Sequence, residues 1–442
     1  MFIVPLSRNH DLSMHQSDGD HNVISGGATS TSPLTVDIDD YVRRREADWI
    51  HLRRHLHRHP EPSGEEFQTS ELILAHLTQH GIQADIAARG VGVVGELPVG
   101  QDPDSGPVIA LRADIDALRM ADHKSLNYAS RVEGCAHACG HDVHTTIMLA
   151  ASETLMTVSQ LDSSSVPSAR IRLIFQAAEE TCKGAQWMVE DGALKDVQAI
   201  LGVHVDPLLR FGEIGICYGT LTAQVDEVAI TVRGQGGHSA RPHDTSDPIA
   251  AAAMLVSLLY QRLPRSTDTR NPSVFTIGQI HGGTAPNVIP DSVELNGSLR
   301  SVETADRKNL LSAIRDTCRH FGDLSGNSLD VEFRNSLGSV RNSELVARAF
   351  ERATRHALGD AAVVLLTQPS MGGEDFAVYL DHVPGAQVRL GCAGDANWPL
   401  LHSPVFDVDE QVIGTGARVV SQAALQLLQH RQESEFQISC PD

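Results

Sequence analysis

The sequence has few of the features that mark membrane proteins or nucleic-acid-binding proteins. It contains no run of about 18 apolar residues, so a transmembrane helix is not expected. Lys and Arg number 35 against 56 Asp and Glu, which gives a formal net charge of −21. Because binding to phosphates needs a basic surface, this balance argues against nucleic acid as a partner.

Cysteines in the spacing of a disulfide framework are also missing. The chain has 7 cysteines, an odd number, and the pair Cys135 and Cys139 is not a CxxC motif. We therefore expect reduced thiols in a cytoplasmic protein. The apolar start, Met1 to Leu6, is too short and too interrupted by Pro5 to form a signal-peptide core. Residues 1–36 are predicted to be a disordered extension, because they are rich in Ser, Gly, Asp, His and Thr.

The remaining sequence indicates two domains. Between residues 37 and 221, short apolar runs alternate with helical patterns, which predicts an α/β fold with a largely parallel sheet. From residue 222 the order changes to β-α-β-β-α-β, which is typical of a ferredoxin-like domain. The α/β pattern then returns. We predict a catalytic domain in two parts, residues 37–221 and 339–442, with an inserted α+β domain at residues 222–338.

The stretch from His137 to His144 has the densest set of metal-binding side chains in the chain. It reads His-Ala-Cys-Gly-His-Asp-Val-His, and thiolate, imidazole and carboxylate are the usual ligands of borderline-soft divalent metals. Cys139 and His141 are two residues apart and can share one face of an extended segment. This combination predicts metal ligation. A Cys139 nucleophile with His partners is the alternative, but it leaves the acids and the remote histidine described next unexplained.

Acids and a histidine that follow apolar runs complete the predicted centre. Glu179 and Glu180 come after the run that ends at Phe175-Gln, and His204 closes the run that begins at Ala199. The ends of parallel strands are where the site residues of α/β proteins collect. A metal hydrolase needs one carboxylate on the metal and another that is free to take a proton from water. Adjacent acids on an irregular backbone can divide these two roles.

Several other residues carry only weak local signals. His238 lies in a glycine-rich stretch, Asn287 in a Gly-Thr-Ala-Pro-Asn turn, and His402 in Leu-His-Ser-Pro. Each is locally better explained as an incidental turn residue. Asp116 is the second acid of Leu-Arg-Ala-Asp-Ile-Asp, and it is a stronger candidate for the site because this motif lies shortly before the Cys/His cluster.

Taken together, these segments resemble the co-catalytic metal amidohydrolases of the aminoacylase and carboxypeptidase G group. The resemblance is strongest to the branch of hippurate hydrolases, N-acyl-amino-acid amidohydrolases and plant auxin-conjugate hydrolases, and it runs from about residue 42 to residue 428. Its ordered motifs are Leu56-His-Arg-His-Pro-Glu, Leu111-Arg-Ala-Asp-Ile-Asp-Ala-Leu, His137-Ala-Cys-Gly-His-Asp, Phe175-Gln-Ala-Ala-Glu-Glu, Gly202-Val-His-Val, Gly236-Gly-His-Ser-Ala, Asn287-Val-Ile-Pro-Asp, Gly373-Glu-Asp-Phe-Ala and Leu401-His-Ser-Pro.

The resemblance implies a role for each matching position. The ligands of two divalent metal ions per subunit, Mn²⁺ or Zn²⁺, would be Cys139, His141, Glu180, His204 and His402. Glu179 would be the general base, and Asp116 would orient the site. The inserted domain would be a lid through which a homodimer forms, with His238 reaching the partner subunit's site. Asn287 and Arg300 would hold the substrate carbonyl or carboxylate.

The implied reaction is hydrolysis of an N-acyl-L-amino acid to a carboxylate and a free amino acid. A dipeptidase or aminopeptidase on the same scaffold, and a catalytically silent metal-binding homologue, are the alternatives. The chain departs from the branch at Arg119, where proline is usual, and at Ala177, which also replaces a proline. Neither position matches a ligand, so these departures concern loop shape and pocket detail.

Overall fold

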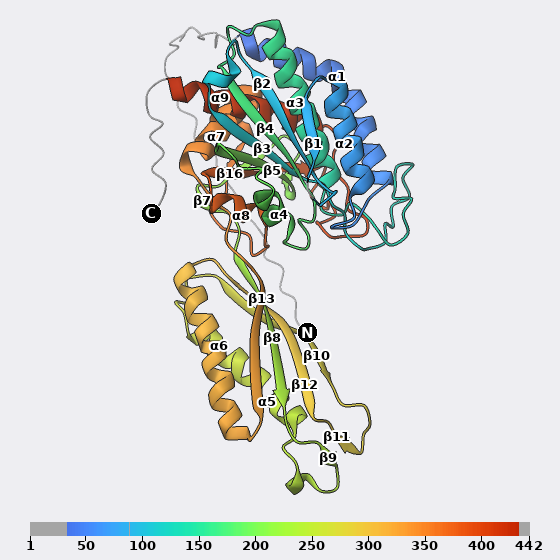
Figure 1. Ribbon diagram of the computed structural model, residues 1–442, viewed down its shortest axis with the longest axis vertical. Helices are drawn as coiled ribbons and strands as arrows, with labels where there is room; N and C mark the ends of the chain where they lie inside the picture. Colours follow the sequence, from blue (N-terminus) through green and yellow to red (C-terminus); the bar gives the residue numbers. More distant parts are fainter. Residues whose placement is uncertain (1–32, 88, 433–442) are drawn as a thin grey trace, which may run out of the picture.

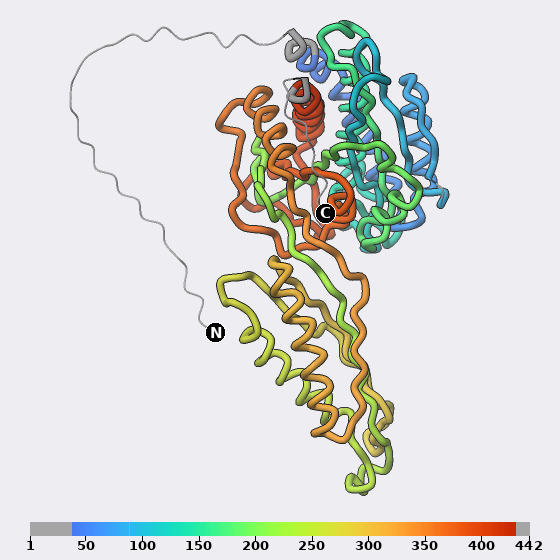
Figure 2. The backbone as a smooth tube through the Cα atoms, turned by 60° about the vertical axis from the view of Figure 1, so that its left-hand side comes forward, coloured from blue at the N-terminus to red at the C-terminus, as the bar shows by residue number. Residues whose placement is uncertain are grey.

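The computed structural model describes residues 33–87 and 89–432. The chain forms two lobes stacked along the long axis of the molecule (Figures 1 and 2). Helix α1 (Pro33–Arg58) begins within the last four residues of the segment predicted as a disordered extension, and residues 1–32 of that segment lie outside the described residues. Among the described residues, no helix combines the length and apolar character needed to cross a bilayer.

An eight-stranded mixed sheet forms the centre of the larger lobe, in the order β1-β2-β4-β3-β5-β16-β6-β15. Its central strands β4, β3, β5 and β16 run parallel to one another, whereas β1, β2 and β6 pair antiparallel to a neighbour. The largely parallel sheet expected from the sequence is confirmed. The strands are β1 (Gln83–Ile86), β2 (Val93–Val99), β3 (Val108–Asp114), β4 (Ala169–Gln176), β5 (Val197–Arg210), β6 (Ile214–Ile216), β15 (Val363–Leu365) and β16 (Gly385–Ala393).

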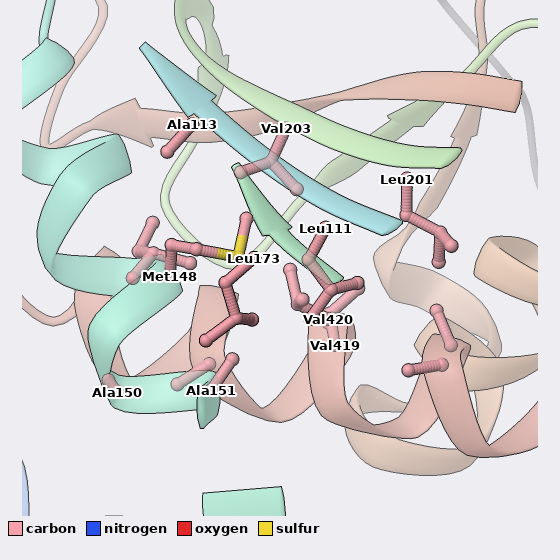
Figure 3. Close-up of a cluster of buried hydrophobic side chains, with 14 of the residues drawn as sticks. Leu111, Ala113, Met148, Ala150, Ala151, Leu173, Leu201, Val203, Val419 and Val420 are labelled. Carbon is pink, nitrogen blue, oxygen red and sulfur yellow. The ribbon is translucent and has the colours of Figure 1, made fainter. Parts of the chain in front are cut away.

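Helices cover both faces of this sheet, so its central strands are apolar on both sides. Every residue of β3 is buried. Leu111 and Ala113 face one cluster of apolar side chains, and Val108 and Ala110 face another. Figure 3 shows Leu111 and Ala113 with apolar side chains from the neighbouring strands and from helices α3 and α9. The helices are α2 (Phe67–Gln79), α3 (His141–Leu161), α7 (Glu344–Leu358) and α9 (Val412–Gln432) with α1 on the first side, and α4 (Gly184–Glu190) and α8 (Phe376–Leu380) on the second.

The smaller lobe is a four-stranded antiparallel sheet in the order β10-β12-β8-β13. Two helices pack on one face of it, and an apolar cluster fills the space between them and the sheet (Figure 2). The predicted β-α-β-β-α-β order is therefore confirmed. The elements are β8 (Gln224–Arg233), α5 (Pro248–Arg262), β10 (Ser273–Gly282), β12 (Ser292–Ser301), α6 (Thr304–Ser325) and β13 (Ser328–Leu337).

Two small ribbons accompany the main sheets, one in the larger lobe beside β16 and one at the tip of the smaller lobe. Strands β9 (Gly237–His238) and β11 (Val288–Ile289) pair at its tip, far from the large sheet (Figure 1). Strands β7 (Gly219–Thr220) and β14 (Arg341–Asn342) pair where the chain enters and leaves the lobe. The connections to the larger lobe therefore run side by side.

Candidate metal centre

Seven of the ten predicted site residues converge on the carboxyl ends of the central strands. This edge is where site residues are expected in a parallel sheet. His204 lies within β5 rather than at a strand end, because that strand continues to Arg210. The other positions are Asp116 after β3, Cys139 and His141 at the start of α3, Glu179 and Glu180 after β4, and His402 between β16 and α9.

Hydrogen bonds fix the orientation of two of the histidines. His141 Nδ1 lies 3.0 Å from Asp116 Oδ1, and His204 Nδ1 lies 2.7 Å from the carbonyl oxygen of Val205. A carbonyl or carboxylate oxygen only accepts, so each Nδ1 carries a proton, and in the neutral ring each Nε2 presents a lone pair. Metal-bound histidines are oriented by hydrogen bonds of this kind.

The donor atoms lie close enough together to be ligands of shared ions, and Cys139 and His204 are also within hydrogen-bond distance of each other. Cys139 Sγ lies 3.5 Å from His204 Nε2, and His402 Nε2 lies 3.5 Å from Glu180 Oε1. His141 Nε2 and Glu180 Oε1 are buried and have no hydrogen-bond partner in the described part of the chain. Cys139 belongs to two donor groups, one with His141 and His204 and one with Glu180 and His402. Thiolate, imidazole and carboxylate in this arrangement fit divalent metals, and Cys139 is the side chain that these two groups share.

Glu179 is a buried carboxyl group beside this donor set. Its Oε2 lies 4.0 Å from His141 Nε2. Burial, and then the neighbouring carboxylates Glu374, Asp375 and Glu180, raise the pKa of Glu179 well above its usual value. A group with a raised pKa in a cleft is suited to exchange protons near neutral pH, although bound cations would act in the opposite direction.

A buried ionic network lies behind Glu179, and the sequence reasoning missed it as part of the site. Arg112, on β3, donates to Asp114 at 2.7 Å and to Asp375 at 3.0 Å. Asp375 also accepts from Gln176 Nε2 at 2.8 Å and from the Ala185 backbone at 3.0 Å. The network thus joins β3, β4 and the start of α4 around the donor set. An arginine inside an otherwise apolar strand was the signal that could have found it.

His144 is the second omission. Its Nε2 accepts from the Val205 backbone at 2.8 Å, so its Nδ1 donates to Asp114 at 2.6 Å. Both nitrogens are therefore used inside the protein, and His144 fixes β5 against α3 instead of offering a ligand. Its place in the Cys/His cluster was the available signal.

A cavity of about 880 Å³ opens in front of the donor set. Cys139, Glu179 and His204 form part of its wall, together with two cationic side chains, Arg300 and Arg389. Arg300 comes from β12 of the smaller lobe and donates to the carbonyl oxygen of Met371 at 2.6 Å. The cavity therefore combines the metal donors with guanidinium groups that can pair with a carboxylate.

His238 and Asn287 are not brought to this cavity within one chain. His238 is in β9 and is exposed, and Asn287 precedes β11. The Asn287 carbonyl accepts from the Ser239 backbone at 3.1 Å, so the two residues share the tip of the smaller lobe. That tip lies at the opposite end of the molecule from the large sheet (Figure 1).

Gly140 lies between the predicted ligands Cys139 and His141 and allows this part of the chain to pack closely against Val205. Its φ of +88° is in the left-handed region, and a Cβ there would lie 2.5 Å from Val205 Cγ2. We expect Gly140→Ala to lower the free energy of unfolding by about 1–3 kcal/mol through overpacking and to reduce metal content. Gly134→Ala is the matched control, because φ is +71° but nothing lies within 4 Å of its Cβ. Urea unfolding and metal analysis of both variants test this, and equal losses would contradict it.

Comparison with known proteins agrees with this arrangement. The profile of Peptidase family M20/M25/M40 matches residues 110–426. The chain is 35% identical to an N-acetyl-L-cysteine deacetylase of Bacillus subtilis, over 88% of this chain and 91% of that protein. It is 33% identical to an IAA-amino acid hydrolase of Arabidopsis thaliana, over 91% of each. A solved structure from Bacillus subtilis, described as a dinuclear metal binding peptidase, matches with a TM-score of 0.75 and 32% identity, over 88% of this chain and 99% of that one.

The family match spans well over half of the chain, and the two relatives align along nearly all of it. The eight-stranded sheet, the inserted lobe and the paired donor groups are the structural counterpart of that match. The chain belongs to Peptidase family M20/M25/M40 and is a metal-dependent amidohydrolase.

Proposed function

We propose that the protein hydrolyses N-acyl-L-amino acids to a carboxylate and a free amino acid. The observation that carries this proposal is the buried carboxyl of Glu179, which shares one cavity with the metal donors and with Arg300. The deacetylase and the IAA-amino acid hydrolase among its relatives support the substrate class. The cysteines of the described residues are all free thiols, five in the larger lobe and Cys318 in the smaller one, which supports a cytoplasmic location.

In this proposal two divalent metal ions, Mn²⁺ or Zn²⁺, are held by Cys139, His141, Glu180, His204 and His402. Bound there, the ions would polarise the amide carbonyl and lower the pKa of the attacking water. Glu179 takes the proton of that water and delivers it to the leaving amine. Asp116 keeps His141 in the tautomer that presents Nε2 to a metal. Arg300 pairs with the substrate carboxylate through the N–H groups that Met371 does not use.

The experiment that tests the substrate class is release of free amino acid from a panel of amides. We expect turnover of N-acetyl, N-benzoyl or indole-acetyl amino acids and little or none of free dipeptides. The cavity is lined by carboxylates, by the metal donors and by the guanidinium groups of Arg300 and Arg389. Faster turnover of dipeptides would show a dipeptidase instead, and no turnover of any amide would favour a silent metal-binding protein.

The proposal includes a homodimer formed through the smaller lobe. Its edge strand β10 and helix α5 expose large apolar side chains, and isolated soluble domains seldom present so many together. They are Ile249, Met254, Leu258, Tyr260, Val274 and Ile280. In such a dimer His238 and Asn287, which are remote from their own cavity, would serve the partner subunit's site.

Mixing two inactive variants tests this sharing of sites. His238→Ala and Glu179→Gln are each expected to have little activity as homodimers. After they are unfolded and refolded together, one site in each mixed dimer would be complete, so activity should return to about a quarter of the wild-type value if subunits pair at random. Activity that stays at the level of the separate variants would contradict the shared site, and size-exclusion chromatography checks that dimers have formed.

A further inference from the structure

A second group of metal-binding side chains lies on the outer helices, away from the cavity. His76 and His80 are four residues apart at the end of α2 and therefore lie on the same face. Glu153 projects toward them from α3. Glu153 follows His141 by twelve residues of one helix, which is roughly 18 Å along its axis. None of the three residues lines the cavity.

One histidine of this group is hydrogen-bonded to Glu153, and the other lies further from it. His76 Nε2 lies 2.7 Å from Glu153 Oε1, which is a hydrogen-bond distance. His80 Nε2 lies 3.6 Å from Glu153 Oε2, which is too long for a good hydrogen bond. Two donors that are each about 2.1 Å from a tetrahedral ion lie about 3.4 Å apart. The three donor atoms lie within 4.8 Å of one another.

The surrounding contacts orient Glu153 and His80 for an ion, whereas His76 Nε2 donates to Glu153 in this structure and would give up that proton when a metal binds. His80 Nδ1 donates to the carbonyl oxygen of His76 at 2.9 Å, so in the neutral ring its Nε2 presents a lone pair. Trp49 Nε1 donates to Glu153 at 3.1 Å and fixes the carboxylate, as outer partners of a metal ligand do. Arg45 also contacts Glu153, at 3.2 Å, and its charge opposes a cation, but it has Asp48 as a second partner.

We propose that His76, His80 and Glu153 form a separate site for a transition-metal ion of the Zn²⁺ class. The side chain of Glu153 is 1% exposed, whereas those of His76 and His80 are 17% and 25% exposed, so an ion can enter from solvent and keep a water ligand. Bound there, the ion would join the end of α2 to α3 and stabilise the helical layer over the sheet. This site does not depend on the proposed activity.

Counting ions per chain tests the site. The full-length enzyme is equilibrated with buffered Zn²⁺, and total bound metal is measured by elemental mass spectrometry. We expect His76→Gln/His80→Gln to hold one ion fewer than wild type while amide turnover is unchanged. Zn²⁺ should also raise the Tm of metal-saturated wild type and not that of the variant, because an ion bound only to the folded state stabilises it.

A second histidine pair provides a matched control. His55 and His59 are also four residues apart, with ring centroids 4.5 Å apart against 4.6 Å for His76 and His80. In the described part of the chain no carboxylate lies within ion-pair distance of either ring, so His55→Gln/His59→Gln should keep every ion. Equal metal content in wild type and in the His76/His80 variant would overturn the proposal, as would loss of the same ion from the control. If the double variant fails to fold, His80→Gln carries the same test.

Discussion

Glu179→Gln is expected to lower kcat by about 10²–10⁴-fold while KM and metal content stay near wild type, because an amide has the shape of the carboxylate but cannot take the proton of the attacking water. Glu179 is 7% exposed and lies beside the donor atoms, close enough to His141 and Glu180 to form a donor group with them but not in the groups named above that share Cys139. Rates of amino-acid release and metal analysis of the same preparation give both quantities.

A control separates this effect from a general loss of charge. Glu190, on α4, is exposed and pairs with Arg89 at 3.3 Å. Glu190→Gln removes one carboxylate from the same part of the chain and should keep the wild-type rate. A Glu179→Gln variant that turns over at the wild-type rate would show that another group is the base. A variant that has lost metal would show that Glu179 is needed to hold the ions.

Removal of the metal ions should abolish turnover completely, and Mn²⁺ or Zn²⁺ should restore it. His141 Nε2 and Glu180 Oε1 are buried without hydrogen-bond partners within the described residues, so the chain alone does not satisfy their hydrogen-bonding capacity. The metal-free protein should also unfold at a lower denaturant concentration, since an ion that binds only the folded state stabilises it. Activity is measured after dialysis against a chelator and again after addition of each metal.

The same experiment decides between metal and thiol chemistry. If Cys139 were a nucleophile, activity would survive the chelator and be lost on alkylation. Cys182 is exposed and also lines the cavity, so an alkylating reagent would reach it first. The comparison is therefore made in a Cys182→Ser background. Activity that survives removal of metal in that background would contradict the proposed mechanism.

The order of the helices and strands and most of the site residues were predictable from the sequence, because local residue patterns alone indicate them. The order of the smaller lobe followed from alternating apolar runs, and Cys139 with His141 from a ligand-rich loop. The position of His204 was predicted, but not that β5 continues beyond it, because the apolar run is interrupted there and only pairing with β16 sustains the strand.

Other features depend on contacts between distant segments and could not be read from the sequence. Arg112 looks like an unfavourable charge in a strand until β4 and α8 bring Gln176 and Asp375 to it. The assignment of Cys139 to two donor groups depends on the fold of the loop that carries His402. The distance of His238 from its own cavity depends on the shape of the whole smaller lobe.

The paired strands β7 and β14, between which the chain leaves for the smaller lobe and returns, make that lobe an exchangeable module. Thr220 and Arg341 face each other across β7 and β14, so the chain leaves the larger lobe and returns to it at neighbouring points. A tight turn of a few residues is long enough to join two antiparallel strands. The larger lobe could thus be closed without the insertion, and a lobe from a relative could be spliced in at the same two positions. Substrate preference and subunit assembly could then be transferred between relatives separately from the metal chemistry.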